Sequence, residues 1–372
     1  MSRRGGLAYL AVFLFALAML FAGSLRHPVY TPDGLVYARF AARDAGRTPE
    51  RATLDARAFY ENTPLMQSPR YRNLVEISTA VAFERSQIFA NRVLYPALAG
   101  ALMPLAGFRA LFVVSALSYV AFAFALLWLL VALGRSWLAL LLTLAALACP
   151  LARTSSASDL TDMLALALWT LALGALLRSM VRGRSNALLA VLAIASVLLV
   201  LTRPTPYLIL LPALAAALLR GMWMELAASA LSLPVFAAAA AASRAFGVSE
   251  QLRWIYANEP QHARGTLAQW YRGALAATIR SALAIAVRSI APVVAVIAAA
   301  YAVMRTALRD EAWVLIAAAA ACVLSLAVNP VPSQIPRVVG LPLLPVFCAL
   351  FQCAFAPPRA DRRRAVRAAH AR

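Results

Sequence analysis

The chain contains no lysine and few acidic residues. Its 372 residues include 35 basic Lys-plus-Arg positions, all of them arginine, against 15 Asp and Glu, and only 13% of the sequence is charged. A soluble domain has about a quarter of its residues charged and about half apolar, whereas 63% of this chain is hydrophobic. The shortage of charge argues against an ordinary soluble domain and indicates a membrane protein. The Arg-only, Ala-rich composition is typical of a high-GC bacterium.

Cysteine is also scarce. The four cysteines lie within or at the ends of apolar runs, without the spacing of disulfide or zinc sites: Cys149, Cys322, Cys348 and Cys353. We interpret them as small hydrophobic residues. The net charge of +20 does not indicate a nucleic-acid partner, because the arginines are dispersed between apolar runs and in the tail, where membrane orientation and lipid headgroups explain them better.

Long apolar runs recur along the chain. The first follows Arg3 and Arg4 and lacks a small-residue cleavage site, so we predict a retained helix and no removed signal peptide. The runs are roughly 7–25, 92–106, 110–133, 137–151, 162–177, 187–201, 206–219, 225–242, 289–304, 313–328 and 338–356.

The distribution of arginine decides how many of these runs cross. If 92–106 crossed, the arginines after 162–177 and those of the C-terminal tail would face outward. If 92–106 lies on the outer surface, which suits its Arg92, Pro96 and Pro104, most short-loop arginines lie inside. The positive-inside rule favours this second topology. We therefore expect an all-α polytopic membrane protein with about ten transmembrane helices and both termini in the cytoplasm.

Two long outer loops follow from this topology. The first, 26–92 (or to about 109 with the interfacial segment), holds seven of the 15 acidic residues, and the second, 243–288, is basic and aromatic. Loops of this length are usually functional or contain helices of their own. We predict one transmembrane domain over 1–356 and a basic cytoplasmic tail over 357–372.

Ionisable residues near the outer ends of the spans form the candidate site. They are Asp33 in TPDGLVYARFA, Asp159 and Asp162 in RTSSASDLTDML, Arg203 in LTRPTPY and Arg337 in QIPRVVGLPLLPV. Ionisable groups at membrane depth are costly and tend to be functional. These residues lie at boundaries, where the cost is small, so structural roles must be considered beside a functional one.

The acidic residues have simple structural alternatives. Asp33 lies between Pro32 and Gly34, and this sequence suits a turn as well as it suits a functional site. Asp159 or Ser158 suits the cap of the following helix, and Asp162 is favourable near its positive end.

The basic and aromatic residues have alternatives as well. Arg203 and Arg337 suit snorkelling anchors, although a cation at a helix N-terminus opposes the macrodipole, which favours an anionic partner for Arg337. Tyr37 and Tyr95 suit an interfacial aromatic belt.

The order of these motifs resembles the GT-C fold of membrane glycosyltransferases, which includes oligosaccharyltransferases, protein O-mannosyltransferases and lipid A aminoarabinose transferases. The family has an early acidic residue in a long first outer loop, as in PDGLVYARFA at 32–41. That loop ends in external helices with a basic-then-proline entry, which ANRVLYPALAGAL at 90–102 is similar to. RTSSASDLTDML at 153–164 and PRVVGLPLLPV at 336–346 resemble later family motifs. The chain departs from the pattern at Val338, where an aromatic is usual, and no C-terminal soluble domain follows.

The resemblance implies an inverting hexosyl- or pentosyltransferase in a bacterial inner membrane, with its active site facing the periplasm. The donor would be a polyprenyl-phosphate sugar and the acceptor a cell-envelope glycan, lipid or protein. Asp33 would be the general base. Arginines would bind the donor phosphate, and the candidates are Arg203, Arg337, Arg288 and Arg280.

The remaining acids would position the acceptor. Asp159 and Asp162 would do this, or would hold a divalent cation such as Mg²⁺ or Mn²⁺ together with Asp33; hard cations need several oxygen ligands, so a metal cofactor stays open. The other candidates are Tyr37, Arg92 and Tyr95.

Two other classes of function remain open. A transporter or flippase for a lipid-linked glycan would need polar residues along its spans and broken helices near the midplane, and the spans here carry almost no ionisable residues. A non-catalytic assembly factor would not depend on its charged loop residues.

Overall fold

The computed structural model describes residues 3–67, 89–243, 266–288, 290–306, 308–328, 330 and 335–356. The described part is helical and contains no β-strand, and an isolated parallel bridge joins Val29 and Ser158. The tail at 357–372 and the part of the second loop at 244–265 lie outside the described residues.

Several helices are long and apolar enough to cross a membrane. Five meet that criterion among the described residues, or six if one bent pair is counted as a single span. The five are Leu94–Leu133 (α7, Leu94–Ala106, with α8, Ala110–Leu133), α11 (Asp162–Arg182), Trp223–Ser243 (α14, Trp223–Ala230, with α15, Ser232–Ser243), α19 (Arg309–Val328) and Pro336–Ala354 (η4, Pro336–Gly340, with α20, Leu341–Ala354). The expectation of a helical membrane protein is confirmed, and the number of about ten crossings stays a prediction.

The bent pair and shorter apolar helices complete the bundle. α9 (Ser136–Ala148) and α10 (Pro150–Ser156) meet at an angle of 63°, because Pro150 cannot continue a helix from the preceding turn. The other helices of the bundle are α1 (Arg3–Arg26), α12 (Asn186–Thr202), α13 (Tyr207–Arg220), α17 (Leu267–Arg288) and α18 (Ile290–Arg305).

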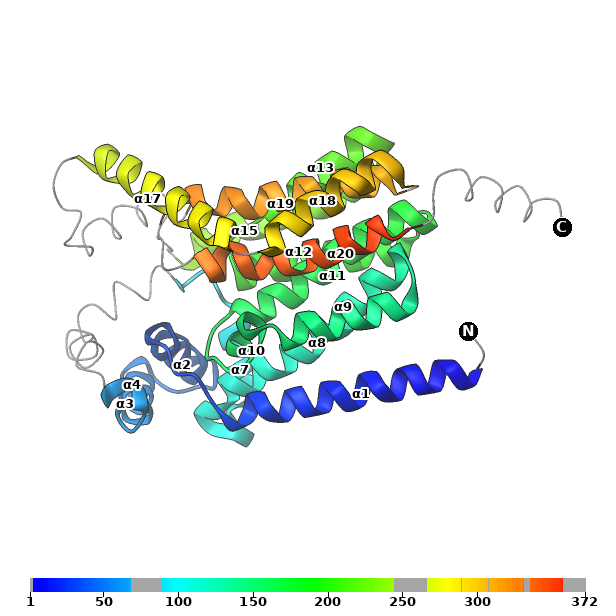
Figure 1. Cartoon of the computed structure of the whole chain (residues 1–372). Coiled ribbons are helices and arrows are strands. Elements are labelled where there is room, and N and C mark those ends of the chain that lie inside the picture. The colour runs from blue at the N-terminus through cyan, green and yellow to red at the C-terminus, as the bar shows by residue number, and fades with distance from the viewer. Residues whose placement is uncertain are drawn as a thin grey trace.

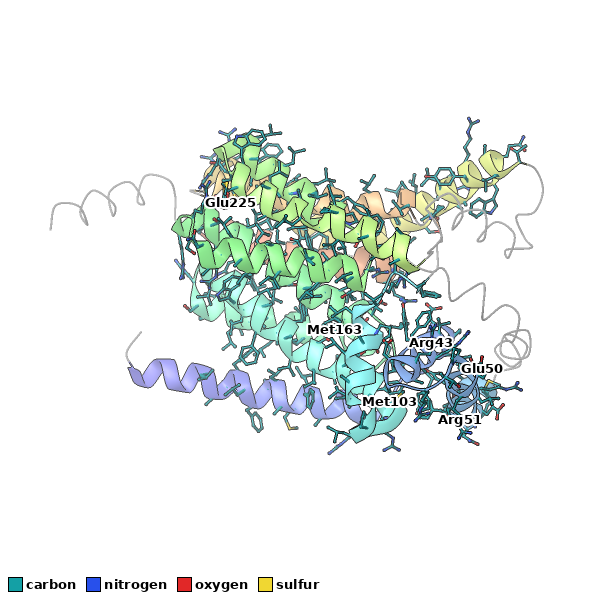
Figure 2. The ribbon with its side chains drawn as sticks, turned by 180° about the vertical axis from the view of Figure 1, so that it is seen from behind. Arg43, Glu50, Arg51, Met103, Met163 and Glu225 are labelled. Atoms are coloured by element: carbon teal, nitrogen blue, oxygen red, sulfur yellow. The ribbon has the colours of Figure 1, made fainter. Side chains whose placement is uncertain are left out.

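The two ends of the bundle differ. α1 begins and α20 ends at one end, and the short helices α2 (Pro32–Asp44) and α3 (Pro49–Glu61) lie at the other (Figure 1). Glu225 lies at the end far from Arg43 and Glu50 (Figure 2).

The segment 92–106 does not simply extend α8. A straight helix of 40 residues would be about 60 Å long at 1.5 Å per residue, about twice the apolar thickness of a bilayer. The helix instead breaks at Gly107, whose φ is +55°, and α7 runs across the bundle end beside α2 (Figure 2). Its place relative to a membrane surface stays a prediction.

Threonine–proline pairs start the helices of the first loop. Thr31 and Thr48 cap α2 and α3 by accepting hydrogen bonds from the backbone N–H of Gly34 and Arg51. The proline that follows each threonine suits the first helical position, where no N–H is needed. α4 (Pro64–Gln67) begins with a third such pair.

A separate apolar cluster joins these short helices to the bundle. Tyr37 of α2, Tyr60 of α3 and Tyr95 of α7 are fully buried in it. α2 and α7 approach closely at Gly100, where an added Cβ would lie 2.9 Å from the carbonyl oxygen of Ala41. The core therefore fixes α2 against the bundle end.

Candidate functional site

Asp33 lies in the first turn of α2. The Thr31 cap and Pro32 set where that helix starts, so the carboxylate of Asp33 projects from a defined position. Its side chain is 32% exposed, and one of its oxygens lies 3.7 Å from Nη1 of Arg337. The segment after Pro32 is helical, and this places Tyr37, four residues after Asp33, on the same face of the helix.

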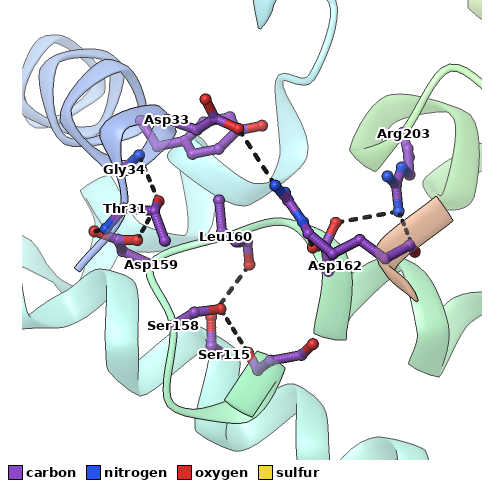
Figure 3. A network of polar contacts seen from close by, with 12 residues as sticks. Thr31, Asp33, Gly34, Ser115, Ser158, Asp159, Leu160, Asp162 and Arg203 are labelled. Atoms are coloured by element: carbon purple, nitrogen blue, oxygen red, sulfur yellow. Dashed lines mark hydrogen bonds and ion pairs between the residues drawn. The ribbon is translucent and has the colours of Figure 1, made fainter. Parts of the chain in front are cut away.

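Asp162 joins two arginines that come from distant parts of the chain. It is the first residue of α11, and its side chain is 1% exposed. Nε of Arg337 donates to its Oδ2 at 2.6 Å, and Nη1 of Arg203 lies 3.1 Å from its Oδ1 (Figure 3). One buried carboxylate therefore holds two guanidinium groups, as a buried charge requires.

A helix end and a π-helical turn place these two arginines beside Asp162. Arg203 is the extended residue that ends α12, and Pro204 after it cannot continue the helix. Arg337 lies in η4, a π-helical turn at the start of the last span. Such turns are rare and occur frequently at functional sites.

Arg92 and Tyr37 lie beside this group. Nη1 of Arg92 donates to the hydroxyl of Tyr37 at 2.7 Å. Burial raises the pKa of Tyr37, so the hydroxyl stays neutral and accepts this bond. We call Asp33, Asp162, Arg203, Arg337 and Arg92 the polar cluster; it contains three guanidinium groups and two carboxylates.

Asp159 is not part of the polar cluster. Its carboxylate accepts hydrogen bonds from Oγ1 of Thr31 at 2.6 Å, from the backbone N–H of Thr31 at 3.2 Å and from the hydroxyl of Tyr60. Gly34 packs so closely on it that an added Cβ would lie 1.9 Å from Oδ2. Asp159 thus ties the start of α2 to the loop before α11.

The environment of Asp159 is buried. It is 0% exposed, and burial raises the pKa of its carboxyl from 3.8 to about 6, although the bonds from Thr31 and Tyr60 oppose the rise. Burial, with the charge of Asp159 next to it, also raises the pKa of Tyr60 well above its usual value. The expectation that Asp159 or Ser158 caps α11 is wrong, since the cap is Thr161 and no side-chain bond is made there.

The three acids do not form a shared set of metal ligands. Asp159 is occupied by Thr31 and Tyr60, and both oxygens of Asp162 face arginines. Among the described residues, no group of three or more His, Cys, Asp or Glu side chains is placed to hold a metal ion. This geometry does not fit one cation between Asp33, Asp159 and Asp162.

The other candidates lie elsewhere. The hydroxyl of Tyr95 donates to the carbonyl oxygen of Leu111 at 2.9 Å and lies 3.1 Å from Oγ of Ser115. Arg280 is exposed on α17, and within the described part no hydrogen bond or ion pair joins it to the polar cluster. Arg288 ends α17, and its side chain is outside the described part.

A small cavity lies directly beneath Asp162 and Arg203. Its volume is about 20 Å³, and Trp169, Ser325 and Pro342 are among its lining residues. That is room for about one water molecule. The space between α11, α12 and α20 is thus closed below the polar cluster.

Sequence reasoning missed the contacts of Thr31, Tyr60 and Gly34. Thr31 followed by proline is a readable helix-start signal. Tyr60 carries no comparable signal, because its partner lies 99 positions away in the sequence.

No family model, curated protein or solved structure matches this chain in the comparisons made.

Proposed function

We propose that the chain is an inverting membrane glycosyltransferase of GT-C type that uses a polyprenyl-phosphate sugar. The observation that carries the proposal is the convergence of Asp33, Asp162, Arg203 and Arg337 at one end of the bundle. The bundle crosses the inner membrane about ten times. The end that carries α2 faces the periplasm, where a lipid-borne donor presents its sugar without any nucleotide-binding domain.

The arginines suit the phosphate of the donor. Among the described residues, the polar cluster contains three guanidinium groups and two carboxylates, so arginine is in excess over acid there. Guanidinium binds phosphate in a planar, bidentate manner. Asp162 holds Arg203 and Arg337 in place beforehand, so little ordering is needed when the donor arrives.

Asp33 suits the general base. It is more exposed than Asp162, so an acceptor hydroxyl has access to it. In the reaction, the acceptor oxygen forms a bond to the anomeric carbon while the bond from that carbon to the phosphate oxygen breaks. The proton of the hydroxyl passes to Asp33, and the arginines stabilise the phosphate that leaves. A single displacement of this kind inverts the anomeric configuration.

The placement of buried charge favours an enzyme over a transporter or flippase. Among the described residues, the buried acids of the bundle lie at helix starts or just before them: Asp159 and Asp162 at α11, Glu225 on α14 and Glu311 on α19. A transport path needs polar groups near the midplane. Substrate handling at one face needs only the residues at that face.

The test is transfer of a labelled sugar from polyprenyl phosphate to acceptors in membranes with matched protein levels. Asp33→Asn keeps the shape but removes the base, so we expect activity to fall by about 10²–10⁴-fold. Arg337→Lys should keep part of the donor use, because it keeps the charge and loses the planar fork.

Glu50→Gln is the matched control, since Glu50 is an exposed acid on neighbouring α3. It should transfer at the wild-type rate. Near-wild-type transfer by Asp33→Asn would remove Asp33 as the base and leave it as a structural residue in the first turn of α2. An assembly factor would show no transfer with the wild-type chain.

A further inference from the structure

A second pocket lies beside the C-terminal end of α1. Its volume is about 270 Å³, whereas one water molecule needs roughly 10–15 Å³ of such space. Gly23 and His27 line it from the end of α1, and Arg153 and Thr154 line it from α10. None of these residues belongs to the polar cluster.

The pocket has the chemistry of an anion site. Arg153, His27 and Thr154 are exposed and carry polar groups that donate hydrogen bonds. In the described part of the chain no carboxylate pairs with Arg153 or His27. This differs from Arg203 and Arg337, which Asp162 holds. Guanidinium binds phosphate, as it binds carboxylate, in a planar, bidentate geometry.

One face of α1 leads from the apolar part of the helix to this pocket. Val12, Phe15 and Met19 are 54%, 71% and 64% exposed, and with Gly23 they follow the three- and four-residue spacing of one helix face. Gly23 has no side chain there, and an added Cβ would meet no atom within 4 Å. The face is apolar along its length and ends in a cationic hollow.

The pocket adjoins the segments that position Asp33. Val29 and Ala157 line it and are joined by a backbone hydrogen bond of 2.8 Å. Two residues further along both segments, Thr31 is bonded to Asp159. A ligand in the pocket therefore contacts the same junction that holds the start of α2.

We propose that this pocket binds the phosphate headgroup of a membrane lipid, with the lipid chains lying along the exposed face of α1. The apolar stripe commits the site to a lipid and not to free phosphate, because only a lipid uses both the stripe and the guanidinium group of Arg153. The site is separate from the polar cluster, and it does not depend on the chain being a glycosyltransferase.

The test measures lipid binding to the purified full-length chain by native mass spectrometry. Dioleoyl phosphatidic acid and dioleoylglycerol are the probes, since they differ only in the phosphate. We expect phosphatidic acid to bind at least about tenfold more tightly, as expected for charge-assisted bonds to one arginine. Excess inorganic phosphate should compete weakly.

Two variants probe the charge and the space independently. Arg153→Gln should remove most of the preference for phosphatidic acid. Gly23→Leu should block the pocket although leucine suits a helix better than glycine, so lost binding with an unchanged or higher melting temperature supports the proposal. Arg109→Gln is the control, an exposed arginine at the α7–α8 junction outside the pocket.

Several results would overturn the proposal. One is equal binding of the two lipids by the wild-type chain. Another is an equal loss in Arg153→Gln and Arg109→Gln, which would indicate a general effect of surface charge. Full phosphatidic acid binding by Gly23→Leu would place the lipid elsewhere, and tight competition by inorganic phosphate would make free phosphate the occupant.

Discussion

Gly34→Ala should destabilise the protein through a single steric contact. The added Cβ would lie 1.9 Å from Oδ2 of Asp159 and 2.5 Å from the hydroxyl of Tyr60. An ordinary van der Waals contact needs about 3.4 Å, so α2 or Asp159 must move by about 1.5 Å (3.4 − 1.9). Such a shift is resisted, because Tyr37 and Tyr60 are both fully buried and fixed by packing.

The expected cost follows from these contacts. Overpacking of a tight site costs about 1–3 kcal/mol of the free energy of unfolding. A further 1.5–3 kcal/mol, roughly, is lost if Asp159 moves out of reach of Thr31, because that hydrogen bond is charge-assisted. The gain in helix propensity from alanine is at most about 1 kcal/mol, so the steric effect dominates.

The assay is a double-mutant cycle of Gly34→Ala and Asp159→Ala by thermal unfolding in detergent. Asp159→Ala removes the atom that clashes, so the double variant should lose less stability than the sum of the single variants, with a coupling of about 0.5–3 kcal/mol. Gly23→Ala is the control, since its Cβ meets no atom within 4 Å. Additive effects, or a Gly34→Ala variant as stable as Gly23→Ala, would refute the close contact.

Two further predictions concern Asp159 and the topology. Burial raises the pKa of Asp159 from 3.8 to about 6, so between about pH 4 and pH 6 the folded chain keeps a proton that the unfolded chain has lost. Stability should therefore decrease as the pH rises through that window, by up to about 3 kcal/mol, and the melting temperature of Asp159→Asn should lack this part of the pH dependence; an unchanged slope would contradict it. Thr154→Cys, in a background without native cysteines, should react with an impermeant thiol reagent from outside, and Asn186→Cys only after permeabilisation. Thr154 is exposed, so a cysteine there is accessible to the reagent, and the reverse labelling pattern would overturn the topology.

Much of the general architecture was readable from the sequence. Apolar runs predicted the helices of the bundle, and threonine–proline pairs marked the starts of the short helices in the first loop. The second loop contains a helix of its own, as its length indicated. Residues 267–288 form the helix α17, whose Trp270 is buried. The arginines of this segment lower its mean hydropathy, but an amphipathic helix can still pack through its apolar face.

The polar cluster was predictable only in part, for a physical reason. Hydropathy and charge distribution indicate how deep a residue lies along the membrane normal, so the sequence predicts Asp33, Asp159 and Asp162 near one end of the spans. They do not indicate the direction in which each side chain points around the bundle. Packing decides that, and it turns Asp159 toward α3 and Asp162 toward the two arginines.

The separation of these two acids, three residues apart, explains how the polar cluster is held together. Asp159 fixes the start of α2, one residue from Asp33, and Asp162 fixes Arg203 and Arg337. Both acids lie in the short stretch that leads into α11, so the proposed base and the proposed phosphate ligands are positioned from the same backbone. A displacement of that stretch would move Asp33 and the arginines together, and misplacement by about 1 Å is enough to lower a rate by about 100-fold. The rigidity of residues 157–162 is therefore as important to the proposed reaction as the residues that would contact the substrate.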